Sequence, residues 1–306
     1  MFISSIDYGF FCLELHDAEI RRWSHILAKV RAILDLVRID LVFGAGIFVV
    51  AGEIFGLGGL PTLNQALLGF LTGFFISGSA NISNDYFDRE VDRVNQPGRP
   101  LPSGRISVAQ LWTLFLIFTA GGLAAATLLG SLVLLLATAV WGIALLYNMK
   151  LKEMGLFGNL TVAFCVAMTV IIGGATIGMI NGIVLTFAAL AFLFDLGEEI
   201  AADAMDVIGD GLRSSRSIAK RKNKTYALRL SGAIFIIFII LSFLPFLMGW
   251  LGYVYLLLIV VTDLCISYLS SRLILSKTIE EGRIQIRRLY LTWGMFVAIF
   301  IFANLI

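Results

Sequence analysis

The chain has few of the residues that build disulfides, zinc sites or histidine-based catalytic centres. Its three cysteines, Cys12, Cys165 and Cys265, stand far apart and show no disulfide or zinc spacing. Its two histidines, His16 and His25, both precede the long apolar segments. We therefore expect the cysteines to be small packing residues, and we expect no histidine base or histidine metal site within the apolar part of the chain.

Charge is also scarce, and its scarcity decides the class of protein. Charged residues make up 14% of the 306 residues and hydrophobic residues 59%, and the mean hydropathy is +0.92. Long apolar runs outnumber what the core of one soluble domain can bury. A soluble globular fold is excluded, and the chain is predicted to be a polytopic helical membrane protein.

Nine apolar stretches approach the length of about 20 residues that a helix needs to cross a bilayer. They are residues 39–59, 66–84, 107–128, 130–148, 157–179, 181–200, 227–249, 251–271 and 287–305. The predicted fold is all-α, with nine transmembrane helices around a central cavity. Residues 39–306 form the transmembrane domain, and residues 1–38 form a separate N-terminal segment.

Basic residues alternate with these stretches. They precede the first stretch and follow the second, fourth, sixth and eighth, whereas the other connections and the C-terminus have no Lys or Arg. The positive-inside rule then places the N-terminus and the even-numbered exits in the cytoplasm and the C-terminus outside the cell membrane.

The first 38 residues are expected to lie along the membrane rather than to form a cleavable signal. Asp7, Glu14 and Asp17 interrupt their apolar start, and a basic segment follows the apolar one, which reverses the secretory order. Between Ile20 and Val37 apolar residues recur at helical spacing with basic residues between them. Such a helix lies on the membrane surface or packs on the helix bundle, and the sequence favours neither.

Two acidic runs with the same DxxDxxxD spacing are the main candidates for a functional site. Positions i, i+3 and i+7 of a helix fall within one narrow arc, so each run directs three carboxylates the same way. Carboxylates at the edge of hydrocarbon are costly unless cations neutralise them. Oxygen ligands without His or Cys suit Mg²⁺, which proteins often share with substrate phosphates. The residues are Asp85, Asp88 and Asp92 in the first run and Asp203, Asp206 and Asp210 in the second.

Basic residues lie beside both runs and on the same predicted face of the membrane. A metal ion with Lys and Arg around a diphosphate stabilises it as a leaving group. A diphosphate above apolar helices describes an isoprenyl diphosphate, with its headgroup at the surface and its tail in the membrane. The basic residues expected to bind it are Arg38, Arg93, Arg99, Lys150, Lys152, Arg213 and Arg216.

Two other interpretations compete with an enzyme. One acidic run alone is often a solvated loop face, but repetition at identical spacing disfavours this. A cation-coupled transporter also uses intramembrane carboxylates, usually near the bilayer midplane. Here both runs lie at one edge of the membrane, which favours the enzyme. No nucleic-acid partner is expected.

The same residues resemble a known family. The segment from Asn84 to Ser107, NDYFDREVDRVNQPGRPLPSGRIS, closely resembles the first signature of the UbiA family of intramembrane prenyltransferases. The segment from Glu198 to Asp210, EEIAADAMDVIGD, is similar to the second. The nine apolar stretches also match that family, so the likeness covers almost the whole chain.

The resemblance implies a role for each matching residue. Asn84 joins the six aspartates as a Mg²⁺ ligand, and Asp88, Asp92, Asp206 and Asp210 are the catalytic carboxylates, beneath a cytoplasmic loop-helix cap. Arg38 resembles the basic motif of the first helix, and Tyr147, Asn148 and Lys150 resemble the patch after the fourth. Glu199 is a candidate ligand or general base. Residues 211–219, GLRSSRSIA, depart from the family pattern around Arg213 and Arg216.

The implied reaction is Mg²⁺-dependent ionisation of an allylic isoprenyl diphosphate, capture of the cation by a membrane-associated acceptor and release of pyrophosphate. The apolar bundle excludes water, which would quench the cation. The family signatures serve several acceptors. An aromatic quinone precursor is our first expectation, and the alternative is the geranylgeranylglyceryl phosphate of archaeal ether lipids.

Overall fold

Every regular element in the described part of the chain is helical. The computed structural model describes residues 23–24, 26–205 and 217–303, with twelve α-helices, one 3-10 helix and no strand among them. The long helices are α2 (Ile39–Leu57), α3 (Leu63–Phe87), α5 (Val108–Leu129), α6 (Ser131–Met149), α7 (Leu156–Thr176), α8 (Gly182–Met205), α10 (Lys224–Ser242), α12 (Tyr253–Ile274) and α13 (Ile279–Ala303). The short ones are α4 (Arg89–Asn95), η1 (Leu151–Met154), α9 (Ile218–Arg221) and α11 (Leu244–Leu247).

The all-helical fold is confirmed, and within the described ranges eight helices are long and apolar enough to cross a membrane. The long helix outside this set is α8, which corresponds to the predicted stretch 181–200. It has the length of a span, but Asp195, Glu198 and Glu199 interrupt its apolar sequence. These three acidic side chains explain why α8 is not apolar enough to be counted with the eight candidate spans.

Two predicted stretches differ from the observed helices for identifiable reasons. The stretch 227–249 is broken at Phe243, because Pro245 in the first turn of α11 cannot continue the hydrogen bonding of α10. The last stretch was predicted to begin at residue 287, whereas α13 begins at Ile279. Its first turns carry charged residues such as Glu280 and Glu281, so an apolar-run criterion misses them.

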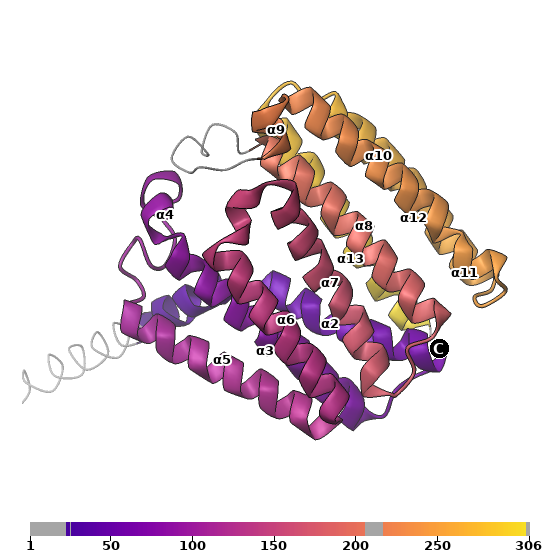
Figure 1. The fold of residues 1–306 in the computed structure, drawn as a ribbon, viewed down its shortest axis with the longest axis horizontal. Helices are drawn as coiled ribbons and strands as arrows, with labels where there is room; N and C mark the ends of the chain where they lie inside the picture. Colours follow the sequence, from indigo (N-terminus) through magenta and orange to yellow (C-terminus); the bar gives the residue numbers. More distant parts are fainter. Residues whose placement is uncertain (1–22, 25, 206–216, 304–306) are drawn as a thin grey trace, which may run out of the picture.

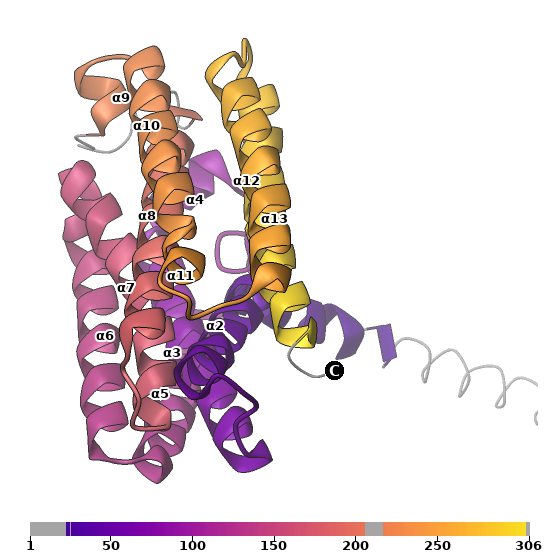
Figure 2. The ribbon, with the colours of Figure 1, turned by 90° about the vertical axis from the view of Figure 1, so that its right-hand side faces the viewer.

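Helices that follow one another in the chain are also neighbours in space, and the last returns to the first. α3 packs on α2 and α5, α7 on α6 and α8, α10 on α8 and α12, and α13 on α12 and α2 (Figure 1). The short helices α4 and α9 lie at the same end of the bundle (Figure 2). We call this the carboxylate end, because the first acidic run joins α3 to α4 there.

Small residues allow α2 and α7 to approach closely. A Cβ atom added to Gly52 would lie 2.2 Å from the carbonyl oxygen of Val170, and one added to Gly173 would lie 2.0 Å from that of Val49. Neither position accepts a larger side chain without moving a backbone. Apolar attraction between helices is weak in lipid, so such close packing is a main source of association.

Residues 26–37, which were expected to form an amphipathic segment, are helical and contact the bundle with one side. Ala32, Leu36 and Val37 are buried and join a cluster with Ile82 of α3 and Leu111 of α5. On the other side apolar side chains remain exposed, among them Trp23, Ile26, Leu27, Val30 and Leu34. The helix therefore packs on the bundle and also presents an apolar surface.

The close contact between α2 and α7 predicts a destabilising substitution. Gly173→Val should lower the apparent Tm of the detergent-solubilised protein by about 5 °C or more, because overpacking against a backbone typically costs about 1–3 kcal/mol. The measurement is thermal unfolding followed by tryptophan fluorescence.

The matched control is Gly294→Val in α13, where an added Cβ meets nothing within 4 Å. An equal Tm for the Gly173 and Gly294 variants would contradict the close-packing account.

Candidate active site

The first acidic run crosses the junction of two helices and remains on one side of it. Asp85 lies in the last turn of α3, Asp88 is both the C-cap of α3 and the N-cap of α4, and Asp92 lies within α4. The backbone of Asp88 stays in the right-handed helical region, and its carbonyl accepts a hydrogen bond from the N–H of Asp92 at 2.8 Å. The helical period thus continues across the junction, and all three carboxylates are buried.

Basic side chains from three separate elements neutralise these carboxylates. Arg38, which precedes α2, donates from Nη2 to Oδ1 of Asp85 at 3.1 Å. Arg99, in the loop after α4, donates from Nη1 to Oδ1 of Asp85 at 3.1 Å and to Oδ2 of Asp92 at 3.0 Å. The ammonium group of Lys152 in η1 contacts Asp88. Three of the predicted diphosphate-binding residues therefore converge on the first acidic run.

The backbone of Arg38 is strained where it begins α2. Its φ of 57° and ψ of 67° lie in the left-handed region, and it is the one non-glycine residue with positive φ in the described ranges. This conformation costs of order 1–3 kcal/mol and persists when surrounding contacts hold it. The bonds from Arg38 to Asn84 and Asp85 are such contacts, and they direct its guanidinium group towards the carboxylates.

A network of amide side chains connects α3 to α6 beside the aspartates. Asn84 donates from Nδ2 to Oδ1 of Asn148 at 2.9 Å. Asn148 donates in turn to the carbonyl of Ala80 and to Oγ of Ser83, both at 2.9 Å. Both amides are buried, so satisfied hydrogen bonds are what make them tolerable there. Asn84 and Asn148 are thereby fixed next to Asp85.

Of the second acidic run, Asp203 is among the residues that the structure describes. Asp203 in α8 accepts a hydrogen bond from Nδ2 of Asn159 in α7 at 3.0 Å. Tyr147, at the end of α6, lies within electrostatic range of Asp203 and Glu199 on α8 and of Asp88 on the first run. Tyr147 is therefore near both acidic runs. The remaining predicted site residues of this segment lie outside the described residues: Asp206, Asp210, Arg213 and Arg216.

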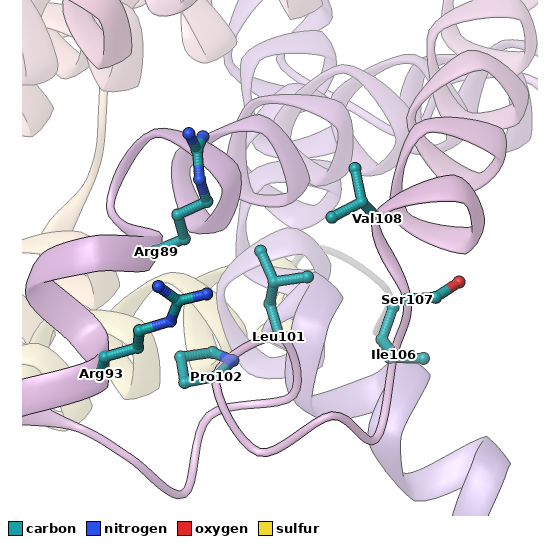
Figure 3. A pocket seen from close by; sticks show the side chains of 7 residues that line it. All are labelled: Arg89, Arg93, Leu101, Pro102, Ile106, Ser107 and Val108. Atoms are coloured by element: carbon teal, nitrogen blue, oxygen red, sulfur yellow. The ribbon is translucent and has the colours of Figure 1, made fainter.

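The other predicted basic residues have different surroundings. Lys150, the C-cap of α6, is exposed, whereas Lys152 two residues later reaches Asp88. Arg93 pairs with Glu90 at 2.8 Å and, with Arg89, lines a separate pocket of about 230 Å³ on the outer side of α4 (Figure 3). The structure therefore separates Lys152 from Lys150, which sequence alone does not, and places Arg93 away from the buried aspartates.

The donor set suits Mg²⁺ in its chemistry. Three buried carboxylates and the amide oxygen of Asn84 offer the hard oxygen ligands that Mg²⁺ prefers. Burial raises the pKa of Asp92; Arg99 opposes this, and the charges of Asp88 and Asp85 add to the increase. Cations close to the carboxylates would lower the free-energy cost of burying their charge.

In the present geometry these carboxylates contact basic side chains. Among the described residues no three His, Cys, Asp or Glu lie close enough together to hold a metal ion. The residues fit a metal site in type, and ligation requires the carboxylates to exchange their Arg and Lys partners for the ion.

Sequence reasoning missed two polar residues near this site. Asn159 fixes Asp203 and has no neighbouring motif to indicate it. Asp195 lies on α8 within electrostatic range of Tyr147, and its Oδ2 is buried without a hydrogen-bond partner. A signal for Asp195 was present, since it stands four residues before Glu199 in an apolar segment, one helical turn away.

Comparison with known proteins agrees with this geometry. A profile of the UbiA prenyltransferase family matches residues 45–302. The chain is 36% identical over 231 residues to the digeranylgeranylglyceryl phosphate synthase of Thermococcus kodakarensis, an alignment that covers 74% of this chain and 81% of the relative. It is 34% identical over 278 residues to the enzyme of the same name from Thermococcus gammatolerans, covering 90% and 98%.

Solved structures share the fold. A structure of a digeranylgeranylglyceryl phosphate synthase superposes with a TM-score of 0.72 at 26% identity, covering 90% of this chain and 98% of the other. A UbiA homologue from Archaeoglobus fulgidus, solved with GPP and Mg²⁺, superposes with a TM-score of 0.68 at 20% identity, covering 87% and 97%. The match over most of the chain favours the enzyme over the cation-coupled transporter, and the chain belongs to the UbiA prenyltransferase family.

Proposed function

We propose that this enzyme transfers an isoprenyl group from an allylic diphosphate to the free glycerol hydroxyl of geranylgeranylglyceryl phosphate, with Mg²⁺ and with release of pyrophosphate. The observation that supports this reaction class is the convergence of Arg38, Arg99 and Lys152 on the buried aspartates. The digeranylgeranylglyceryl phosphate synthases among the relatives support the acceptor. These relatives favour the ether-lipid alternative over the aromatic quinone precursor that was our first expectation.

The basic side chains have a direct role in this proposal. In the present geometry Arg38, Arg99 and Lys152 pair with Asp85, Asp92 and Asp88. When a diphosphate binds, they turn towards its oxygens and take up the charge that develops as the C–O bond breaks. Asn84 and the aspartates of both runs would hold Mg²⁺, which would supply further charge neutralisation on the diphosphate.

The acceptor binds on the side of Tyr147, Asn148 and Glu199. Tyr147 is near both acidic runs, so an acceptor hydroxyl beside it would be close to the carbon that ionises. The hydroxyl oxygen forms the new C–O bond and loses its proton, which a carboxylate of α8 receives. Glu199 is our assignment for this base, with Asp195 one turn deeper along the same helix. The surrounding apolar helices exclude the water that would otherwise capture the cation.

The membrane arrangement completes the proposal. We assign nine spans by counting α8 with the eight apolar helices, because it packs between α7 and α10. The carboxylate end and the N-terminus face the cytoplasm, as the distribution of basic residues indicates. α4, the loop 96–107, η1 and α9 form the cap over the diphosphate site. In this orientation the C-terminus lies outside the cell membrane.

The decisive experiment measures pyrophosphate release by the purified protein in detergent. Geranylgeranyl diphosphate and Mg²⁺ are combined with geranylgeranylglyceryl phosphate, 4-hydroxybenzoate or a dihydroxynaphthoate. We expect release that depends on the glyceryl phosphate acceptor, that stops with EDTA and that returns with added Mg²⁺. Release only with an aromatic acceptor would restore the quinone assignment. Activity indifferent to EDTA would contradict the metal-dependent mechanism.

Removing the charge of Asp88 should abolish transfer. Asp88→Asn should lower kcat/KM at least about 100-fold, because it removes both a metal ligand and the partner of Lys152. Asp263→Asn is the matched control, since Asp263 lies in α12 and accepts a hydrogen bond from Ser242 at the end of α10. Equal kcat/KM values for the two variants would contradict the assignment of Asp88.

The two lysines after α6 should differ in their effects. Lys152→Gln should raise the KM for the allylic diphosphate roughly tenfold or more, because a charge-assisted hydrogen bond is worth about 1.5–3 kcal/mol. Lys150→Gln, which removes an exposed ammonium group two residues away, should produce a smaller increase. Steady-state kinetics at saturating acceptor provide the measurement, and the reverse order would assign the contact to Lys150.

A further inference from the structure

We propose that the pocket on the outer side of α4 binds the phosphate headgroup of an anionic membrane phospholipid, at a site separate from the reactive centre. The pocket has a volume of about 230 Å³ and is lined by Arg89 and Arg93 together with residues of the loop that leads into α5. The inference rests on the membrane location of the protein and does not depend on the identity of the acceptor.

The two arginines are held on one side of α4. They are four residues apart, so they lie one above the other on the same face of the helix. The Arg89 guanidinium carbon lies 4.4 Å from the centre of the Tyr86 ring, and its Nη1 donates to the Tyr86 carbonyl at 3.1 Å. Figure 3 shows Arg93 beside it, with its guanidinium group extended towards Leu101. The pocket is thus lined by two arginine side chains, of which Tyr86 positions the first. Guanidinium is the side-chain group best suited to binding phosphate.

The present partner of both arginines is weakly bound and easily displaced. Glu90 approaches Arg93 at 2.8 Å and Arg89 at 3.4 Å, and 64% of the Glu90 side chain is exposed. Exposed ion pairs of this kind contribute about 0–1 kcal/mol. A phosphate offers several acceptor oxygens to the same two guanidinium groups, so it competes effectively with one exposed carboxylate.

The rest of the pocket suits the lipid rather than a free anion. Leu101, Pro102, Ile106 and Val108 provide an apolar wall opposite the arginines, whereas the hydroxyl of Ser107 points away and caps α5 (Figure 3). Beyond Val108, the exposed side chain of Leu116 provides further apolar surface about two turns along α5. Acyl chains attached to the bound phosphate can follow this surface into the bilayer.

The prenyl acceptor also carries a phosphate, but the geometry separates it from this pocket. Asp88 and Asp92 are buried, whereas the side chains of Arg89 and Arg93 are 39% and 64% exposed. Successive residues of a helix point about 100° apart, so the two arginines leave α4 in a different direction from the two aspartates. The aspartates pair with Arg99 and Lys152, and the arginines pair with the exposed Glu90. The bilayer phospholipid is therefore the favoured source.

The experiment measures the amount of lipid bound to the protein, in nanodiscs and by native mass spectrometry. Wild type is compared with the double variant Arg89→Gln/Arg93→Gln in mixtures of phosphatidylglycerol and phosphatidylcholine. The control, Arg221→Gln/Lys222→Gln, removes the same charge at α9. We expect the double variant to bind phosphatidylglycerol roughly 30-fold more weakly than wild type or less tightly still, because it loses charge-assisted hydrogen bonds to the phosphate that are each worth about 1.5–3 kcal/mol. The control should retain the lipid.

A second measurement distinguishes the source of the phosphate. Binding of geranylgeranylglyceryl phosphate is measured for the same proteins in phosphatidylcholine alone, after thermal unfolding has verified that each is folded. The proposal requires that loss of phosphatidylglycerol is not accompanied by loss of this acceptor. Weaker acceptor binding with unchanged phosphatidylglycerol would assign the pocket to the acceptor. Equal loss of phosphatidylglycerol in the control would show that general surface charge, and not this pocket, binds the lipid. Either result would overturn the proposal.

Discussion

The neutralisation of three buried carboxylates at one end of an apolar bundle is the constraint on which the site depends. Asp85, Asp88 and Asp92 are each almost inaccessible, and an uncompensated charge is costly there. Arg38, Arg99 and Lys152 reach them from three different parts of the chain. The ion pairs therefore bring together the start of α2, the loop after α4 and the 3-10 helix after α6.

The apolar packing of the bundle maintains this arrangement. Gly52 and Gly173 bring α2 against α7, which fixes the start of α2 relative to the helices that follow. Asn148 bonds α6 to α3, and Asn159 bonds α7 to Asp203 of α8. These polar bonds position the carboxylates, and buried apolar side chains fill much of the remaining space between the helices. A metal-assisted ionisation needs this rigidity, because its charges must be in place before the diphosphate leaves.

α4 illustrates how one short helix serves two surfaces. Its sequence alternates acids and arginines, so the linear order suggests a single charged cluster. The helical period separates them, and Asp92 faces the buried site whereas Arg93 faces outwards. The same period explains why Arg99, beyond the helix, replaces Arg93 as the partner of the aspartates. Charge close in sequence and charge close in space are different properties here.

The sequence by itself determined the helical membrane fold, the family and the two acidic runs, because hydropathy and residue spacing are local properties of the chain. It did not determine which cations meet which carboxylates: Lys152 and not Lys150 contacts Asp88, and Arg93 turns to Glu90. It also missed Asn159, since no local pattern marks a residue that acts across two helices. Those choices depend on how α3, α6, α7 and α8 pack, and only the tertiary structure decided them.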